Sequence, residues 1–215
     1  MKLSFINISI ILFYFILPAI SQANNPETSK TNFKNNETPK IITGELMHKM
    51  CQDTTRSSMK SLCIEILSNF IGKPLTPTTL VGVMKIAENH ANMTRVKIPG
   101  LLKNTKDEIS KLKSTNHRPN SFSHKEAMYI LNKKESKYEQ CDKSYAYAVS
   151  QLNGINISNK ISIKDHIRNA MQAVWLCNMD HKLAFKGMPE DVLAPDNRKF
   201  DDLCYIIMIV SNPKN

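Results

Sequence analysis

Five cysteines behind an apolar amino-terminal segment constrain this chain more than any other feature. Cys51 and Cys63 lie twelve residues apart, Cys141 and Cys177 lie thirty-six apart, and Cys204 stands in an apolar run. An exported chain meets oxidising conditions, so such cysteines indicate disulfide bridges before they indicate catalysis or metal binding. Two bridges can be chosen from five cysteines in fifteen ways, and spacing alone does not select one of them.

The first 23 residues have the anatomy of a signal peptide. Lys2 provides a positive start, residues 5–20 are almost all apolar, and Ser21 and Ala23 supply small residues at the cleavage site. The alternative is a single transmembrane anchor, because sixteen apolar residues are only just too few to span a bilayer. The small residues and the polar flank favour cleavage after Ala23. We therefore expect a secreted protein.

The chain is basic, with a formal net charge of +10 that becomes +9 over 192 residues when the segment carrying Lys2 is removed. That length allows one domain with a substantial core. A basic surface can bind polyanions. The lysines are scattered, however, and no nucleic-acid recognition motif accompanies them. Solvated surface charge is the simpler interpretation, and an acidic polysaccharide or acidic protein is the alternative for an exported chain.

After the signal, the pattern is helical almost throughout. Residues 24–40 are rich in Asn, Thr, Lys and Pro and predict a flexible polar leader. Few glycines occur and no run alternates apolar with polar residues, so residues 41–213 predict an all-α domain. Two short helices are expected over Gly44–Gln52 and 58–70, and a bridge between Cys51 and Cys63 would clamp them as a hairpin.

Four longer helices follow. One starts near Thr78, is kinked or ended at Pro99, and resumes over 101–112, before a loop over 114–121. The next two are expected to begin at caps formed by Ser123 and Ser162, and residues 185–189 end the second of them. The last three helices each carry an apolar stripe. The stripes are Ala127, Leu131, Tyr138, Cys141, Tyr145, Ala148 and Leu152 in the helix after Ser123; Ile163, Ile167, Ala170, Val174, Cys177 and Ala184 in the helix after Ser162; and Phe200, Leu203, Ile207 and Val210 in the last helix. The pattern predicts an antiparallel four-helix bundle after the hairpin, in which Cys141 and Cys177 face the core on neighbouring helices.

The domain resembles the plant inhibitors of pectin methylesterase and acid invertase. The resemblance is carried by the order and spacing of Met50-Cys51-x-x-Thr54, Cys63-x-x-x-Leu67, Cys141-x-x-x-Tyr145-x-x-Ala148-x-x-x-Leu152, Cys177-x-x-Asp180 with Phe185-Lys186-Gly187, and Asp202-Leu203-Cys204 with Ile209-Val210-Ser211-Asn212. It implies the bridges Cys51–Cys63 and Cys141–Cys177, a free Cys204, and a monomer that blocks its enzyme by covering the active-site cleft. It also implies a place outside the cell, in the cell wall, with the vacuole as the alternative.

The last helix looks more like the pectin methylesterase branch, and the Pro-Lys-Phe motif of some invertase inhibitors is absent between Cys141 and Cys177. Pectin methylesterase is therefore the expected partner, with acid invertase as the alternative and a non-inhibitory binding module on the same bundle as a further one. The family's use of the two helices joined by the second bridge implies target contacts on their outward positions. These are Lys143, Tyr147, Ser150, Asp165 and Asn169, where other members carry several acidic residues on the first helix.

Other functions have little support. The six histidines, at 48, 90, 117, 124, 166 and 181, form no pair four residues apart on an expected helix, so no metal site is predicted. No G-x-S-x-G elbow and no glycine-rich phosphate loop occur, so we expect no enzyme activity and no cofactor. Cys204 predicts a buried small hydrophobe. Glycosylation sequons stand at Asn36, Asn156 and, within an expected helix, Asn92.

Overall fold

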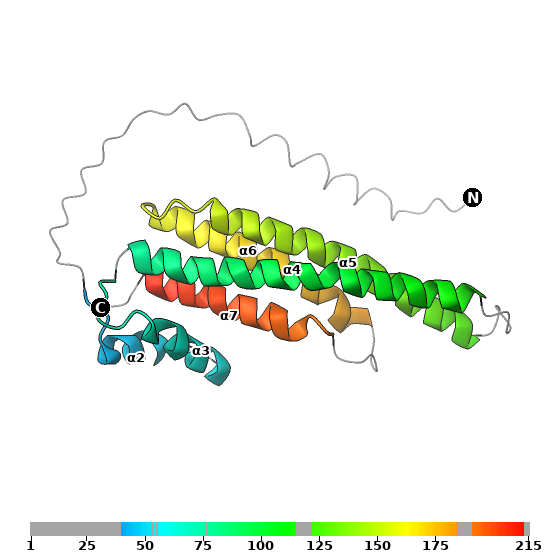
Figure 1. Ribbon diagram of the computed structural model, residues 1–215, viewed down its shortest axis with the longest axis horizontal. Helices are drawn as coiled ribbons and strands as arrows, with labels where there is room; N and C mark the ends of the chain where they lie inside the picture. Colours follow the sequence, from blue (N-terminus) through cyan, green and yellow to red (C-terminus); the bar gives the residue numbers. More distant parts are fainter. Residues whose placement is uncertain are drawn as a thin grey trace, which may run out of the picture. The chain divides into compact units, whose positions relative to one another are not determined.

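The structure of the chain, a computed structural model, consists of helices (Figure 1). It describes residues 40–52, 54, 56–75, 77–114, 122–184 and 191–212, with the backbone alone for 178–184. The helices are α2 Gly44–Gln52, α3 Ser57–Ser68, α4 Pro77–Ser114, α5 Phe122–Asn153, α6 Lys160–Ala184 and α7 Ala194–Ser211. The predicted signal peptide, the leader up to residue 39, the loop over 115–121 and the segment 185–189 lie outside the described residues.

Helices α4 to α7 form an antiparallel four-helix bundle. Each of α4 and α6 packs against both α5 and α7, and the four lie side by side in Figure 1. The buried apolar residues of all four helices and of the α2–α3 hairpin belong to one core cluster. The predicted all-α fold, with its disulfide-clamped hairpin before the bundle, is confirmed. Within the described residues, none of the helices has the length and apolar character needed to cross a membrane.

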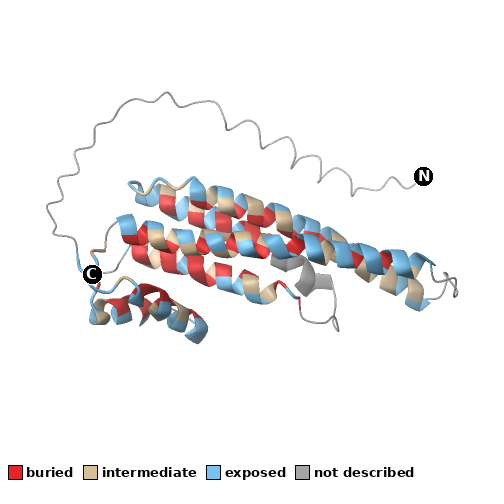
Figure 2. Ribbon diagram, viewed as in Figure 1, coloured by how far each residue is buried: buried red, intermediate tan, exposed pale blue. Residues whose placement is uncertain are grey.

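The predicted stripe of α5 is buried over only part of its length. Tyr138, Cys141, Tyr145, Ala148 and Leu152 are buried, as expected, whereas Ala127 and Leu131 are half-exposed. The reason is the length of the partners: α4 and α5 have 38 and 32 residues, and α7 has 18. Both long helices therefore extend beyond the rest of the bundle, where exposed and half-buried positions predominate (Figure 2). A two-helix contact cannot bury a stripe as completely as a four-helix core does.

Pro99 does not end the third helix, which was one of two outcomes expected for it. Helix α4 runs through Pro99 from Pro77 to Ser114. A proline there leaves the carbonyl of Arg95 without its helical donor. Pro99 is exposed, so water can serve that carbonyl, while Ile98 just before it and Thr105 after it are fully buried. Packing on both sides of the proline holds the helix together across it.

The predicted caps were wrong in position. Helix α6 begins at Lys160, and the side-chain oxygen of Asn159 accepts hydrogen bonds from the backbone N–H groups of Ile161 and Ser162 at 3.0 and 3.2 Å. Asn159 is thus the cap, and Ser162 already lies inside the first turn. Helix α5 likewise begins at Phe122, one residue before Ser123.

The α2–α3 hairpin is closed on itself by a disulfide and by backbone hydrogen bonds at its base. Cys51 and Cys63 are bonded across the two helices. At the base, the N–H of Ile42 donates to the carbonyl of Lys73 and the N–H of Gly72 donates to the carbonyl of Ile42, both at 2.9 Å. Gly72 has φ of +79°, a left-handed conformation that favours glycine. The chain can therefore turn sharply after α3, which ends at Ser68 rather than at the predicted residue 70.

Two further contacts seat the hairpin on the bundle. A Cβ atom on Gly82 of α4 would lie only 2.8 Å from the ring of Phe70, so the absence of a side chain there lets the hairpin approach the α4 backbone closely. On the other side, the guanidinium group of Arg56 lies 3.3 Å from Asp201 and 3.2 Å from Asp202 of α7. Burial raises the pKa of both carboxyl groups, and the charge of Arg56 opposes that shift.

We expect the two aspartates to make the fold less stable as the pH rises. Because the folded-state pKa is raised, folding favours the protonated form, so this contribution is complete below the ordinary aspartate pKa of about 3.9 and is lost as the pH passes through the raised value. The measurement is urea unfolding, followed by circular dichroism across the acidic range, for the wild type and for Asp201→Asn/Asp202→Asn. The stability of the wild type relative to the variant should fall with rising pH, and a constant difference would contradict the prediction.

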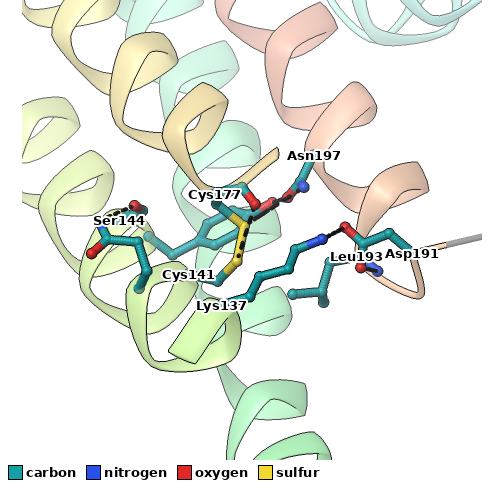
Figure 3. The surroundings of a disulfide bond; sticks show 9 residues. Lys137, Cys141, Ser144, Cys177, Asp191, Leu193 and Asn197 are labelled. Atoms are coloured by element: carbon teal, nitrogen blue, oxygen red, sulfur yellow. Dashed lines mark hydrogen bonds and ion pairs between the residues drawn. A yellow bond between two sulfur atoms is a disulfide. The ribbon is translucent and has the colours of Figure 1, made fainter. Parts of the chain in front are cut away.

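The second bridge sits beside a buried ion pair (Figure 3). Cys141 of α5 is bonded to Cys177 of α6. One turn earlier on α5, the ammonium group of Lys137 contacts the carboxylate of Asp191, and both side chains are buried. The other oxygen of Asp191 accepts a hydrogen bond from the N–H of Leu193 at 3.1 Å, immediately before α7. The start of α7 is thereby fixed to α5 by a charge pair.

Lys137→Ala should destabilise the protein by about 3–5 kcal/mol, because it leaves the Asp191 carboxylate buried without its partner. The double variant Lys137→Met/Asp191→Asn removes both charges and keeps an oxygen for the N–H of Leu193, so it should recover most of the loss. Lys106→Ala is a matched control, since its pair with Glu135 at 3.6 Å is partly exposed and should be worth less than about 1 kcal/mol. Urea unfolding measures all three, and equal effects for Lys137→Ala and Lys106→Ala would refute the assignment.

Candidate binding face on α5 and α6

The five residues predicted to contact a target are all exposed. Lys143, Tyr147 and Ser150 follow one another at spacings of four and three on α5, and Asp165 and Asn169 are four apart on α6. Such spacings place residues on one side of a helix. The apolar stripes of both helices point into the core, so the five side chains occupy outward positions. We call this set the α5–α6 face.

The face is continuous across the two helices at one end. The amide of Asn169 donates to the side-chain oxygen of Gln151 at 3.4 Å, and Nδ1 of His166 lies 2.9 Å from the same oxygen. Gln151 directly follows Ser150, so Ser150 and Asn169 lie near each other beside the α5–α6 turn. Asp165 lies one helical turn further toward that end, and Lys143 lies about two turns away along α5. The structure therefore brings four residues together and leaves Lys143 at the far end.

Tyr147 is the large side chain near the middle of the face. It is 49% exposed, and its backbone carbonyl accepts a hydrogen bond from the Ser150 hydroxyl at 2.7 Å. The only acidic member, Asp165, lies 3.8 Å from Arg168, and both are largely exposed. An exposed pair at that distance contributes little to stability and leaves both groups available to a partner. The face is thus a mixed polar surface around one aromatic ring.

The helices beneath the face are held by the disulfide and by a polar contact in the core. The hydroxyl of Tyr145, next to Ser144 on α5, donates to the side-chain oxygen of Asn197 on α7 at 2.7 Å. The ring of Tyr145 meets that of Phe200 edge to face, with 5.8 Å between the ring centres. Burial, reinforced by the negative charge of Asp196, raises the pKa of Tyr145, so its hydroxyl stays protonated and can donate.

Cys204 and the sequons have different surroundings. Cys204 is fully buried and forms no disulfide. Burial, with the charge of Asp201 adding to it, raises the pKa of its thiol well above the ordinary value, which disfavours the reactive thiolate. Asn156 is exposed in the turn between α5 and α6, and its side chain accepts a hydrogen bond from the N–H of Ser158. Asn92 is half-buried on α4, and Asn36 lies outside the described residues.

Periodicity did not identify the exposed residues on the other side of α6. Trp175 is the only tryptophan of the chain and is 53% exposed, and Tyr205 on α7 is 40% exposed. Both line hollows between α6 and α7, together with Arg168 and Asp201. The sequence did indicate that both aromatic residues are exposed, because neither falls on the apolar stripe of its helix. A position off the stripe does not by itself reveal which neighbouring helix lies beside it.

No family model matches, and no curated protein matches in sequence. Among solved structures, the chain is similar to the crystal structure of a pectin methylesterase inhibitor from Arabidopsis thaliana, with a TM-score of 0.36 and 15% sequence identity, over 81% of this chain and 100% of that chain.

Proposed function

We propose that this protein is a secreted inhibitor that forms a stoichiometric complex with pectin methylesterase and covers the active-site cleft of that enzyme. The supporting observation is the position of the α5–α6 face. All five residues to which the sequence resemblance assigns target binding are exposed, and they lie on the two helices that the Cys141–Cys177 bond joins. A surface held rigid in this way loses little conformational entropy when it binds.

Inhibition by occlusion needs only shape and contact area. An interface of ordinary size buries roughly 1,600 Å² in total, or about 800 Å² on each partner. The outward sides of two adjacent long helices can supply such an area. Tyr147, near the middle, is the proposed anchor, because aromatic residues near the centre of an interface often contribute most to affinity. Lys143, at the end of the face, is expected to act mainly on the association rate.

The first test is inhibition itself. The folded, oxidised protein is titrated into separate assays of pectin methylesterase and of acid invertase. The concentration of each enzyme is set well above the expected dissociation constant of the complex. We expect pectin methylesterase activity to fall linearly to a one-to-one end point while invertase activity is unchanged. Inhibition of invertase alone would make acid invertase the target in place of pectin methylesterase. No inhibition of either enzyme would overturn the proposal and favour a non-inhibitory binding module.

The second test concerns the face. Tyr147→Ala should weaken binding by more than about 1 kcal/mol if the ring is central. Tyr129→Ala is the matched control, because Tyr129 is a tyrosine of similar exposure, 53%, on the same helix but eighteen residues away from Tyr147. Its loss should leave affinity unchanged. The melting temperature of each variant is measured beside its affinity, which separates a binding role from shielding of the helix.

Charge reversal provides an independent check of the same face. Lys143→Glu should change the association rate and its salt dependence in the direction set by the charge of the enzyme surface, and Lys103→Glu on α4 should change neither to the same extent. Unchanged binding for both Tyr147→Ala and Lys143→Glu, in an inhibitor that still works, would move the contact to another part of the molecule.

A further inference from the structure

A cleft runs between α6 and α7 on the side of α6 that faces away from α5. Two adjoining hollows, of about 620 and about 490 Å³, share Met171, Trp175 and Asp201 in their walls, so together they form one groove. Arg56, just before α3, lines the end of the groove nearest the hairpin, and Tyr205 lines the other hollow. Two consecutive helices, α6 and α7, and the distant residue Arg56 therefore build this surface.

The groove exposes two aromatic rings. Trp175 on α6 is 53% exposed and Tyr205 on α7 is 40% exposed. Single exposed apolar residues are normal on a protein surface, but two aromatic side chains lining one hollow form a local apolar shelf. The methionine side chains of Met171 and Met208 line the same hollow. The shelf is an open hollow lined by two partly exposed aromatic rings rather than a closed pocket.

Guanidinium groups border the shelf. Arg56 forms ion pairs with Asp201 and Asp202. The carboxylate of Asp201, which lines the groove, is therefore already paired with a cation. Among the described residues, Arg168 forms one ion pair, with Asp165 of the α5–α6 face at 3.8 Å, and both side chains are largely exposed. In the described part of the chain no carboxylate lies within ion-pair distance of Arg198, whose charge acts on Asp202 at longer range. Two guanidinium groups are thus available beside the rings, in a chain whose net charge is +10.

This combination has a definite chemical preference. A planar guanidinium group binds a carboxylate with two parallel hydrogen bonds. The electron-rich face of an indole or phenol ring attracts the weakly positive C–H groups of a ligand laid against it. The wall also contains hydroxyl and amide groups, from Ser58 and Gln172, which suit hydroxyl-bearing ligands. The residues of a protein partner that contribute most to affinity bind in fully desolvated pockets, which this open groove does not provide.

We propose that the α6–α7 groove is a binding site for a carboxylated oligosaccharide. One or two sugar rings lie on Trp175 and Tyr205, and their carboxylates pair with Arg168 and Arg198. The site does not depend on the proposed inhibition. The groove adjoins the α5–α6 face on α6, since Arg168 pairs with Asp165 at 3.8 Å, but its two aromatic rings stand on α6 and α7, whereas Tyr147 stands on α5.

The sole tryptophan makes the test direct, because its emission reports on this groove alone. The full-length oxidised protein is titrated with a short oligogalacturonate, and calorimetry is run on the same samples. We expect a saturable change in Trp175 emission that weakens as salt is added. The same oligosaccharide with every carboxylate methyl-esterified keeps the rings and removes the charges, and it should bind at least about ten-fold more weakly.

Variants locate the binding. Arg198→Ala and Arg168→Ala leave the reporter in place and should each weaken binding by about ten-fold, as the loss of a charge-assisted hydrogen bond predicts. Lys103→Ala on α4, which contributes no residue to the groove, is the matched control for net charge and should have little effect. Tyr205→Ala should weaken binding of the oligogalacturonate without changing the salt dependence.

Several results would overturn the proposal. They are the absence of both an emission change and binding heat, equal affinity for the esterified oligosaccharide, and an effect of Lys103→Ala as large as that of Arg198→Ala. Oligoglutamate is titrated as well. If it binds as tightly as oligogalacturonate at equal charge, the groove recognises an acidic polypeptide and not a sugar. Because enzyme inhibition is measured separately, failure here leaves the proposed function standing, and the reverse also holds.

Discussion

The covalent bond between Cys141 and Cys177 holds the middle of α5 against the middle of α6, and most other features depend on the register that it sets. On the chain-entropy model this bridge stabilises the fold by about 4 kcal/mol and the shorter Cys51–Cys63 bridge by about 3 kcal/mol. The contacts of Gln151 with His166 and Asn169 belong to the same antiparallel register. One turn before Cys141, Lys137 extends the arrangement to the start of α7 through Asp191. Three helices are thus positioned within two turns of one disulfide.

Much of the fold could be predicted from the sequence because local patterns decide it. The range Gly44–Gln52 was predicted for the first helix and is found there. The apolar stripes predicted for α6 and α7 are buried wherever their side chains are described. Prediction failed where a distant part of the chain decides the outcome. The burial of Ala127 and Leu131 depends on how far α6 and α7 reach, and the continuity of α4 through Pro99 depends on packing around Ile98 and Thr105. Periodicity contains neither kind of information.

Of the two candidate surfaces, one follows from local sequence patterns and the other depends on distant parts of the chain. The exposure of Tyr147 and Asn169 could be predicted, because a position opposite an apolar stripe must face outward on any bundle. The α6–α7 groove could not be predicted, because it requires Trp175 and Tyr205 from different helices, and Arg56 from a third element, to meet at one place. Nothing local in the sequence indicates that Arg56 lies 3.3 Å from Asp201. Surfaces shared between elements need a structure to be found.

The close approach of Phe70 to Gly82 has a consequence for how the molecule behaves as a whole. A helical segment pair as short as α2 and α3 cannot bury enough surface to fold alone. The backbone hydrogen bonds at its base close the hairpin on itself, and its stability depends on the bundle at two contacts, the glycine on α4 and the aspartates on α7. A glycine inside a helix costs about 1 kcal/mol relative to alanine, so α4 is weakened where the hairpin is seated. Because the hairpin also shares the apolar core of the bundle, we expect the two to unfold together rather than one after the other.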